Sequence, residues 1–277
     1  MPEITLESIP KAAQRGNPSF VWRAGQERRL AMLNRFAPLA NRRVLEFGCG
    51  IGLYVQAIRR YTPHVVGFDI EVDRLRIGYQ QGVRGLVAAA AEQLPFADGT
   101  FDVVFSNEVL EHVGDDRAAC REIARVLRPG GRAVIFVPNR WYPFETHGVY
   151  WRGRYYFGNQ PFVNWLPARW RDRLAPHVRA YTGRQLLALF RGTPMRLIAH
   201  TQIYPGFDEL IARVGFPGKL LRAIMHRLER SPLRIFGLSH LLVMERTQDS
   251  PVSSAAAPGS LPNQRGMAGA GWSGNQR

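Results

Sequence analysis

Three glycines in a five-residue loop are the first groups in this 277-residue sequence whose spacing suggests chemistry. The segment Glu46-Phe47-Gly48-Cys49-Gly50-Ile51-Gly52 overlaps a short apolar run that predicts a buried strand over residues 44–47. Glycine is needed where a turn is tight and where the backbone must approach a ligand closely. Open α/β sheets bind ligands beyond the carboxyl ends of their strands, so this loop predicts a nucleotide-type binding site.

Asp69 is the second candidate, because it follows a predicted strand over residues 65–68 and lies 21 residues after Gly48. A carboxylate at this point can accept both hydroxyls of an adenosine ribose; the alternative is an acid that only caps the next turn. The Gly-x-Gly-x-x-Gly pattern of dinucleotide-binding folds would need glycine where this chain has Leu53. An NAD-dependent oxidoreductase is therefore the disfavoured alternative.

Side chains that could take up a proton follow two further predicted strands. Glu108, Glu111 and His112 come after the fourth strand, and Glu145 and His147 come after the fifth. His112 is the first candidate for a general base, since the pKa of histidine lies near neutrality. Each of these residues could instead organise its loop through hydrogen bonds. We find no metal-ligand spacing and expect no metal.

Strands alternating with helices along the chain would position these residues on a parallel sheet. Strands are predicted over residues 44–47, 65–68, 86–87, 101–106, 133–137, 195–204 and 238–244, and helices over 53–60, 72–81, 115–127 and 182–190. The predicted organisation is an N-terminal helical segment (1–42), a cofactor-binding core (43–138), an insertion or lid (139–180), the rest of the sheet domain (181–247) and a disordered tail (248–277).

Four motifs between Arg43 and Pro138 together resemble the class I methyltransferases, specifically the group called type 11. They read VLEFGCGIG, VVGFDI, AEQLPFADGTFDVVFSNEVLEHV and LRPGG. The resemblance implies an α/β, Rossmann-like, doubly wound sheet of seven strands whose last strand is antiparallel. It also implies S-adenosylmethionine as the cofactor and methyl transfer as the reaction.

The same resemblance assigns roles within the cofactor site. It places Glu46 near the methionine amine, Asp69 at the ribose hydroxyls and Asn107 on the methionine side. The remaining expected cofactor contacts are Gly48, Cys49, Gly50 and Gly52 in the loop, Ile70 against the adenine, and Ala91 and Glu92 at the adenine edge. Ala90 departs from the aspartate frequent in the family. A cofactor-binding protein without turnover is therefore kept as an alternative.

The predicted insertion is rich in aromatic residues and points to the methyl acceptor. Eleven aromatic side chains lie between Trp141 and Trp170, with Arg152, Arg154 and Arg169 among them. Such a lid suits an apolar or planar acceptor held through an anionic group, such as a small molecule or a lipid-linked compound. The alternative is that the aromatic residues build the insertion's own core.

The charge is concentrated in the second half of the chain. The whole sequence carries a net charge of +15, of which residues 146–277 carry +12. Leu220, Ile224 and Leu228 share one face of a predicted helix whose other face is basic, so the helix either docks on the domain or contacts a membrane. The strand-end sequence Ser106-Asn107-Glu108-Val109 disfavours a nucleic-acid base as the acceptor.

Composition limits the cellular setting. Cys49 and Cys120 give no disulfide framework, and neither a secretory signal nor a spanning helix is apparent. We expect a cytoplasmic protein, with peripheral contact to the inner membrane surface as an option. The sequence leaves the oligomeric state open.

Overall fold

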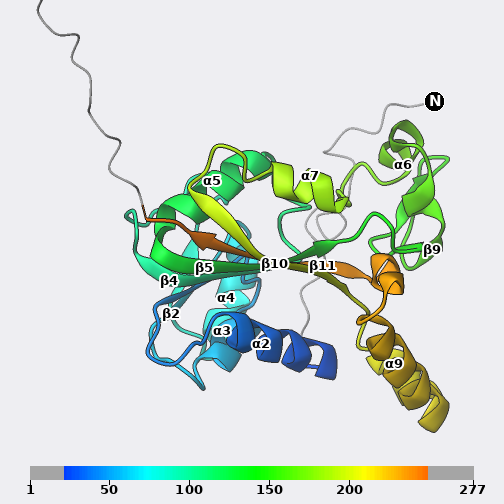
Figure 1. Ribbon diagram of the computed structural model, residues 1–277, viewed down its shortest axis with the longest axis horizontal. Coiled ribbons are helices and arrows are strands. Elements are labelled where there is room, and N and C mark those ends of the chain that lie inside the picture. The colour runs from blue at the N-terminus through cyan, green and yellow to red at the C-terminus, as the bar shows by residue number, and fades with distance from the viewer. Residues whose placement is uncertain (1–21, 249–277) are drawn as a thin grey trace, which may run out of the picture.

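A seven-stranded sheet forms the centre of the computed structural model, which describes residues 22–248 (Figure 1). Its strands, in sheet order, are β10 (Met195–Ile203), β11 (Ser239–Arg246), β5 (Leu127–Pro138), β4 (Phe101–Asn107), β1 (Val44–Phe47), β2 (Val65–Asp69) and β3 (Leu86–Ala88). β11 runs antiparallel to both of its neighbours, β5 and β10, and the other six strands all run in the same direction. The predicted seven-stranded sheet with an antiparallel last strand is confirmed.

Helices cover both faces of the sheet, as expected for a doubly wound fold. The helices of the domain are α2 (Ala24–Phe36), α3 (Leu53–Ile58), α4 (Val72–Gln80), α5 (Asp116–Val126) and α7 (Gly183–Ala188). Apolar side chains of α2, α3 and α4 form one buried cluster with the sheet, and those of α5 and α7 form another (Figure 1). The capping box predicted for Thr182 and Gln185 does open α7.

Close packing holds the glycine loop against the helix that follows β2. A Cβ added to Gly78 of α4 would lie 2.4 Å from the carbonyl oxygen of Ile51, and one added to Gly67 of β2 would lie 2.7 Å from the Cβ of Cys49. Neither approach leaves room for a larger side chain, because the atoms met belong to backbone or to a buried core residue. The absence of side chains at these two positions therefore lets the glycine loop pack directly against α4 and β2.

The segment Leu127-Arg128-Pro129-Gly130-Gly131 differs from its prediction. We expected it to end the helix and the fifth strand to begin at residue 133, but α5 ends at Val126 and β5 already begins at Leu127. Pro129 disfavours the helical conformation of Arg128, the residue before it, so the helix is not favoured beyond Leu127. The backbone of Leu127 is extended and pairs with Phe101 of β4, after which the register shifts.

The insertion after β5 consists of short elements. They are β6 (Phe144–Glu145), β7 (Val149–Trp151), β8 (Arg154–Tyr156), β9 (Gln160–Pro161), the 3-10 turn η2 (Val163–Trp165) and α6 (Ala168–Leu174). β6 pairs with β9, and β7 pairs with β8. Ladders of two or three residues are marginal on their own, so other contacts must hold this segment together.

The C-terminal part of the described chain contains α8 (Asp208–Val214), α9 (Phe216–Leu228) and the 3-10 turn η3 (Pro232–Phe236). α9 extends away from the sheet domain (Figure 1), and Phe216, Leu220 and Ile224 on it are exposed. The predicted basic amphipathic helix is confirmed, but the domain does not cover its apolar face. No helix among residues 22–248 is long and apolar enough to cross a membrane. The predicted disordered tail and the first residues of the N-terminal segment lie outside the described residues.

Protonation of His240 should destabilise the fold at acidic pH. His240 of β11 is buried, its Nε2 lies 2.9 Å from the carbonyl oxygen of Tyr181, and burial lowers its pKa from 6.5 to about 4. Between these values the unfolded chain binds a proton that the folded chain does not. The free energy of unfolding should therefore fall by roughly 3 kcal/mol between pH 6.5 and pH 4.

Urea unfolding at several pH values would measure this dependence. The variant His240→Gln should show a flatter profile between pH 4 and 6.5 than the unmodified protein, whereas His64→Gln, which changes an exposed side chain, should not. Equal slopes for His240→Gln and the unmodified protein would contradict the assignment.

Candidate functional site

A cavity of about 500 Å³ lies at the carboxyl ends of β1, β2 and β4. That size suits a cofactor or drug-sized ligand. Of the residues expected from the sequence to contact a cofactor, the following line the cavity: Glu46, Gly48, Cys49, Gly50, Asp69, Ile70, Ala91, Glu92 and Asn107. Gly52 is not among the lining residues; it caps α3 with a backbone φ of +84°.

Asp69 joins the glycine loop to the end of β2. The backbone N–H of Gly50 donates to Asp69 Oδ2 (2.8 Å), and the N–H of Glu71 donates to Oδ1 (2.9 Å). Gly48 and Gly50 both have positive φ, which L side chains rarely adopt. The loop geometry and the orientation of the carboxylate therefore depend on each other.

Glu46 places an unpaired carboxylate oxygen in the same cavity. The side chain is 4% exposed, and its Oε2 has no hydrogen-bond partner among the described residues. Burial, together with the nearby charge of Asp69, raises the pKa of Glu46 well above its usual value. A buried oxygen of this kind is stabilised by a cationic ligand. The methionine ammonium of S-adenosylmethionine meets that requirement, so the residues present fit this cofactor.

The residues expected at the adenine differ in their relation to the cavity. Ile70 is 50% exposed although it lines the cavity, as expected for a side chain that would pack on a planar ligand. Glu92 also lines the cavity, and its Oε1 accepts a hydrogen bond from the N–H of Asp115 at the start of α5 (3.1 Å). Ala90 is not a lining residue.

Arg29 of α2 is a site residue that the sequence did not reveal. Its guanidinium donates to Asn107 Oδ1 and to Ser239 Oγ (2.8 Å) and forms an ion pair with Glu108 (2.9 Å). It also lies over the ring of Phe136. Arg29 thus connects α2 with the ends of β4 and β11, and no local motif would have identified it among the many arginines of this chain.

The two acids that follow β4 have opposite protonation tendencies. Burial alone would raise the pKa of Glu108, but Arg29 and the hydroxyl of Ser239 hold it below its usual value. Burial and the neighbouring charge of Glu108 raise the pKa of Glu111 well above its usual value. The loop therefore offers an ionised carboxylate at Glu108 beside a neutral carboxyl group at Glu111.

His112 and His147 lie close together at the cavity. Both line it, and their ring centroids are 5.2 Å apart. They come from different parts of the chain, because His112 follows β4 and His147 belongs to the insertion. The structure thus brings the two candidate histidines together with Glu108 around one space.

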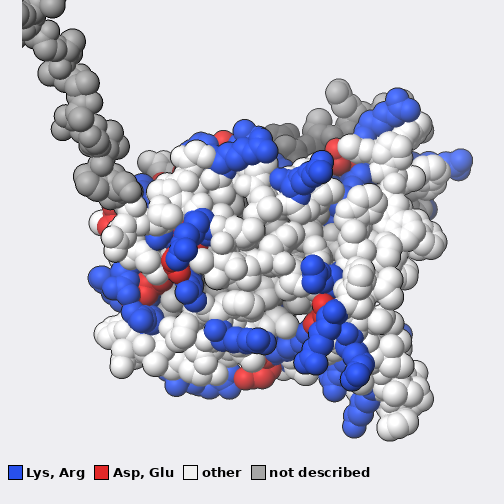
Figure 2. All heavy atoms as spheres, in the orientation of Figure 1, with Lys and Arg blue, Asp and Glu red and all other residues white. Residues whose placement is uncertain are grey.

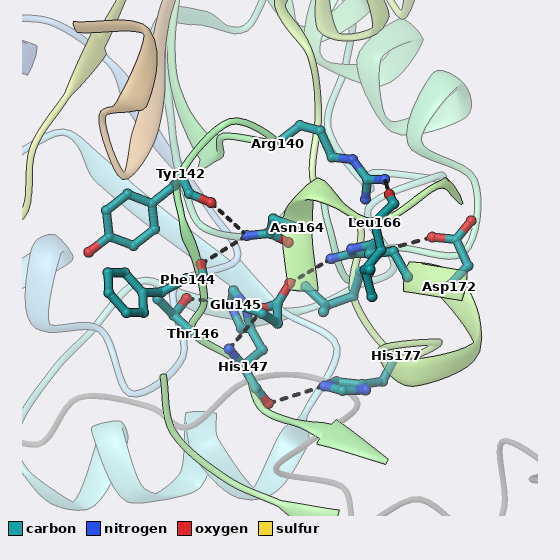
Figure 3. A network of polar contacts seen from close by, with 12 residues as sticks. Arg140, Tyr142, Phe144, Glu145, Thr146, His147, Asn164, Leu166, Asp172 and His177 are labelled. Carbon is teal, nitrogen blue, oxygen red and sulfur yellow. Dashed lines mark hydrogen bonds and ion pairs between the residues drawn. The ribbon is translucent and has the colours of Figure 1, made fainter. Parts of the chain in front are cut away.

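Glu145, the remaining candidate base, does not line the cavity. It is 2% exposed and lies behind His147, with Oε1 3.1 Å from His147 Nδ1 and Oε2 2.8 Å from Arg171 Nη2 (Figure 3). Although burial opposes ionisation, His147 and Arg171 lower the pKa of Glu145 to about 2. This geometry supports a positioning residue and not the general base that the sequence suggested.

Arg171 explains how the insertion stays folded, and its role could not be read from the sequence. It is 2% exposed, and besides pairing with Glu145 it donates to the carbonyl oxygen of Val178. Its partners lie 26 residues before it and 7 residues after it. The pair thus ties β6 to α6 and to the segment that returns to the sheet.

The residues that match a methyltransferase domain include all the expected cofactor contacts that line the cavity. A family model described as a methyltransferase domain matches residues 45–135. The demethylmenaquinone methyltransferase of Corynebacterium kroppenstedtii is 36% identical over 107 residues, which cover 39% of this chain and 46% of the relative. A ubiquinone biosynthesis O-methyltransferase of Ralstonia nicotianae is 37% identical over 118 residues, covering 40% and 50%. The chain thus spans about half the length of these curated relatives.

Solved structures share the fold over a larger part of the chain. An S-adenosylmethionine-dependent methyltransferase from Mesorhizobium loti has a TM-score of 0.56 at 20% identity and covers 81% of this chain and 98% of its own. A geranyl diphosphate C-methyltransferase from Streptomyces coelicolor, solved with S-adenosylhomocysteine, has a TM-score of 0.55 at 18% identity, covering 80% and 79%. A [4+2]-cyclase also shares the fold, with a TM-score of 0.56 at 18% identity, covering 82% and 83%. Residues 45–135 thus match a methyltransferase domain, and the sheet order is that of the fold shared with solved S-adenosylmethionine-dependent methyltransferases.

Proposed function

We propose that this protein transfers a methyl group from S-adenosylmethionine to a small, apolar acceptor. The observation that carries the proposal is one cavity lined by two chemically different sets of residues, called here the cofactor half and the acceptor half. One half is formed by the glycine loop, Glu46 and Asp69 of the methyltransferase domain, and the other by His112 and His147. Small-molecule methyltransferases among the relatives support the same class of reaction.

The residues of the cofactor half would hold the donor. Asp69 would accept hydrogen bonds from the ribose hydroxyls, and Glu46 would face the ammonium group. When bound, S-adenosylmethionine supplies a methyl group already activated by its sulfonium. The protein then has to align the acceptor and exclude water. Thr146, Tyr155 and Phe157 of the insertion line the acceptor half and would do so.

A base is needed only for an acceptor that carries a proton when it is attacked. Glu108 is kept ionised by Arg29 and lines the cavity, and His112 lies beside it in sequence. These two residues are therefore the candidates for proton uptake. Glu145 would act through His147 by holding its Nδ1 atom.

Calorimetry and product analysis test the proposal in two stages. We expect S-adenosylmethionine to bind with a stoichiometry of one, and labelled cofactor incubated with cell extract to yield a methylated small molecule identifiable by mass spectrometry. Absence of cofactor binding would overturn the proposal. Binding without any methylated product would favour the alternative of a binding protein, which the fold allows because a [4+2]-cyclase shares it.

Exposed aromatic residues of the insertion support a lipid-linked acceptor. Phe157 lines the cavity and is nevertheless 68% exposed. Other large aromatic residues of the insertion are exposed as well: Trp141, Phe144, Trp151, Tyr156, Phe162, Trp165 and Trp170. Within the insertion Tyr150 is buried and packs against Tyr155. The insertion's own core therefore uses only part of its aromatic content.

This aromatic surface continues onto η3 and toward α9. The rings of Trp165 and Phe236 are 6.1 Å apart, and Figure 1 places the insertion, η3 and α9 along one side of the molecule. In Figure 2 uncharged atoms extend along this side, while Lys and Arg gather next to them around the base of α9. Aromatic and apolar side chains flanked by basic ones are typical of segments at an anionic membrane surface. We include peripheral membrane contact in the proposal.

Vesicle co-sedimentation should report this contact. The protein should bind vesicles containing anionic phosphatidylglycerol more strongly than vesicles of phosphatidylcholine alone, and high salt should weaken the binding. Leu220→Asp combined with Ile224→Asp on α9 should reduce binding about tenfold or more, because it places charge on the inserted face.

Leu197→Asp is the matched control, since Leu197 of β10 is about as exposed but lies outside this surface. Equal binding to both kinds of vesicle, or equal losses for the control and the α9 variant, would count against membrane contact.

A further inference from the structure

We propose that Glu111, His112 and His147 bind one divalent transition-metal ion at the acceptor side of the cavity. One potential ligand atom from each residue lies within 4.8 Å of the other two. Two imidazole nitrogens and a carboxylate oxygen suit ions such as Zn²⁺, Mn²⁺ or Fe²⁺. This site departs from the sequence-based expectation of no metal, because Glu111 and His112 are adjacent in sequence and His147 is distant from both.

Glu111 supplies an observation independent of this clustering. The residue is 1% exposed, neither carboxylate oxygen has a hydrogen bond of normal geometry among the described residues, and the carboxylate of Glu108 lies close beside it. A buried carboxyl group without partners is costly unless it binds a cation or forms the hydrogen bonds that it lacks here. A metal ion next to His112 and His147 would satisfy the carboxylate.

His147 is held in the way that a metal-binding histidine requires. Its Nδ1 is engaged by Glu145, which leaves Nε2 as the nitrogen for a metal. Glu145 is in turn paired with the buried guanidinium of Arg171 (Figure 3). Metal-binding histidines commonly pair their second ring nitrogen with a carboxylate, which fixes the ring and increases its basicity. The support that would orient His147 toward a metal is therefore already in place.

Only small movements separate the present arrangement from a closed site. Metal–ligand distances of about 2.1 Å place the ligands of a tetrahedral ion about 3.4 Å apart. The ligand atoms, which lie within 4.8 Å of one another, would close by about 1.4 Å at most. His147 belongs to the insertion and the other two ligands to the sheet domain, so the metal would fasten the insertion over the cavity.

Three protein ligands leave at least one coordination position open. Since His112 and His147 line the cavity, this position would face the acceptor half and take an oxygen atom of the acceptor. A metal bound there would polarise that oxygen, and His112 would then act as a ligand instead of taking up a proton. This role of the open position rests on the proposed function, whereas metal binding itself does not.

Metal binding to the full chain, prepared without a histidine tag and freed of metal by a chelator, tests the proposal. We expect calorimetry with Zn²⁺ and with Mn²⁺ to give one site per chain. We also expect X-ray absorption of the Zn²⁺ form to show about two imidazoles and no sulfur in the first shell. His112→Gln and His147→Gln should each weaken binding at least tenfold, because each removes one of three ligands.

His64→Gln is the control, since it removes an exposed histidine elsewhere. S-adenosylmethionine affinity, measured on the same samples without metal, reports whether each variant is folded, because neither histidine belongs to the cofactor half. The proposal is overturned if the unmodified protein binds no stoichiometric metal, if the absorption spectrum lacks imidazole ligands, or if both histidine variants bind as tightly as the control. If the unmodified protein does not bind S-adenosylmethionine, the proposed function is contradicted, and metal binding is still tested.

Discussion

Replacing Asp69 with alanine should weaken the binding of S-adenosylmethionine by about 100-fold or more. Hydrogen bonds to a charged group contribute roughly 1.5–3 kcal/mol each, and the Asp69 carboxylate would accept two from the ribose. Losing about 3 kcal/mol corresponds to somewhat more than a hundredfold change in affinity. The substitution also removes the acceptor for the N–H of Gly50, so the glycine loop loses its link to β2.

Calorimetric titration of the variant with S-adenosylmethionine would measure this effect. Asp73→Ala is the matched control, because Asp73 lies near Asp69 in sequence but is exposed on α4 and pairs only with Arg76 in the interactions described. Asp69→Asn should fall between the two, since it keeps an acceptor oxygen and loses the charge. An affinity of Asp69→Ala within a few-fold of the control would show that the ribose is bound elsewhere.

Replacing Arg171 with methionine should unfold the insertion. The Arg171–Glu145 ion pair is almost fully buried, and removing one partner of such a pair costs about 3–5 kcal/mol because the other charge remains buried and uncompensated. The small ladders β6–β9 and β7–β8 cannot offset that loss. We expect the insertion to become sensitive to proteolysis, while the sheet domain keeps its affinity for S-adenosylmethionine.

Limited proteolysis with mass spectrometry would locate the cleavage sites, which should fall between residues 139 and 180. Combining Arg171→Met with Glu145→Met should restore part of the resistance, since it removes both buried charges. Arg169→Met is the control, because Arg169 is exposed on the same helix. Protection of the insertion in Arg171→Met to the same degree as in the control would contradict the structural role of the ion pair.

The cofactor half of this protein could be predicted because its parts are local. The strand ending at Phe47, the glycine turn and the helix α3 are consecutive, and their hydrophobic pattern and glycine spacing are visible within a dozen residues. Asp69 required only the next strand. Because the carboxyl ends of parallel strands meet at one edge, the topology implied that Glu46, Asp69 and Asn107 would be neighbours. They all line one cavity.

Boundaries were predicted less well where backbone pairing competed with local preference. The Leu127 to Gly131 segment resembles a helix stop followed by a loop, yet pairing with β4 draws Leu127 into β5. Likewise, an amphipathic pattern identified α9 but could not show that its apolar face is exposed. In both cases the outcome depends on which neighbour is available, and sequence periodicity does not contain that information.

The acceptor half was decided by the tertiary structure. Sequence alone predicted the sheet, a candidate donor site and an aromatic insertion with candidate bases. Only the tertiary contacts show that Glu145 positions His147. They also show that Arg29 and Arg171, among 35 arginines, form buried or partly buried ion pairs. The same contacts place Glu111 and His112 beside His147. Hydrophobic periodicity indicates which face of a helix or strand is buried. The partner of a buried charged side chain can lie far away in the sequence, and that partner determines the protonation and the role of the side chain.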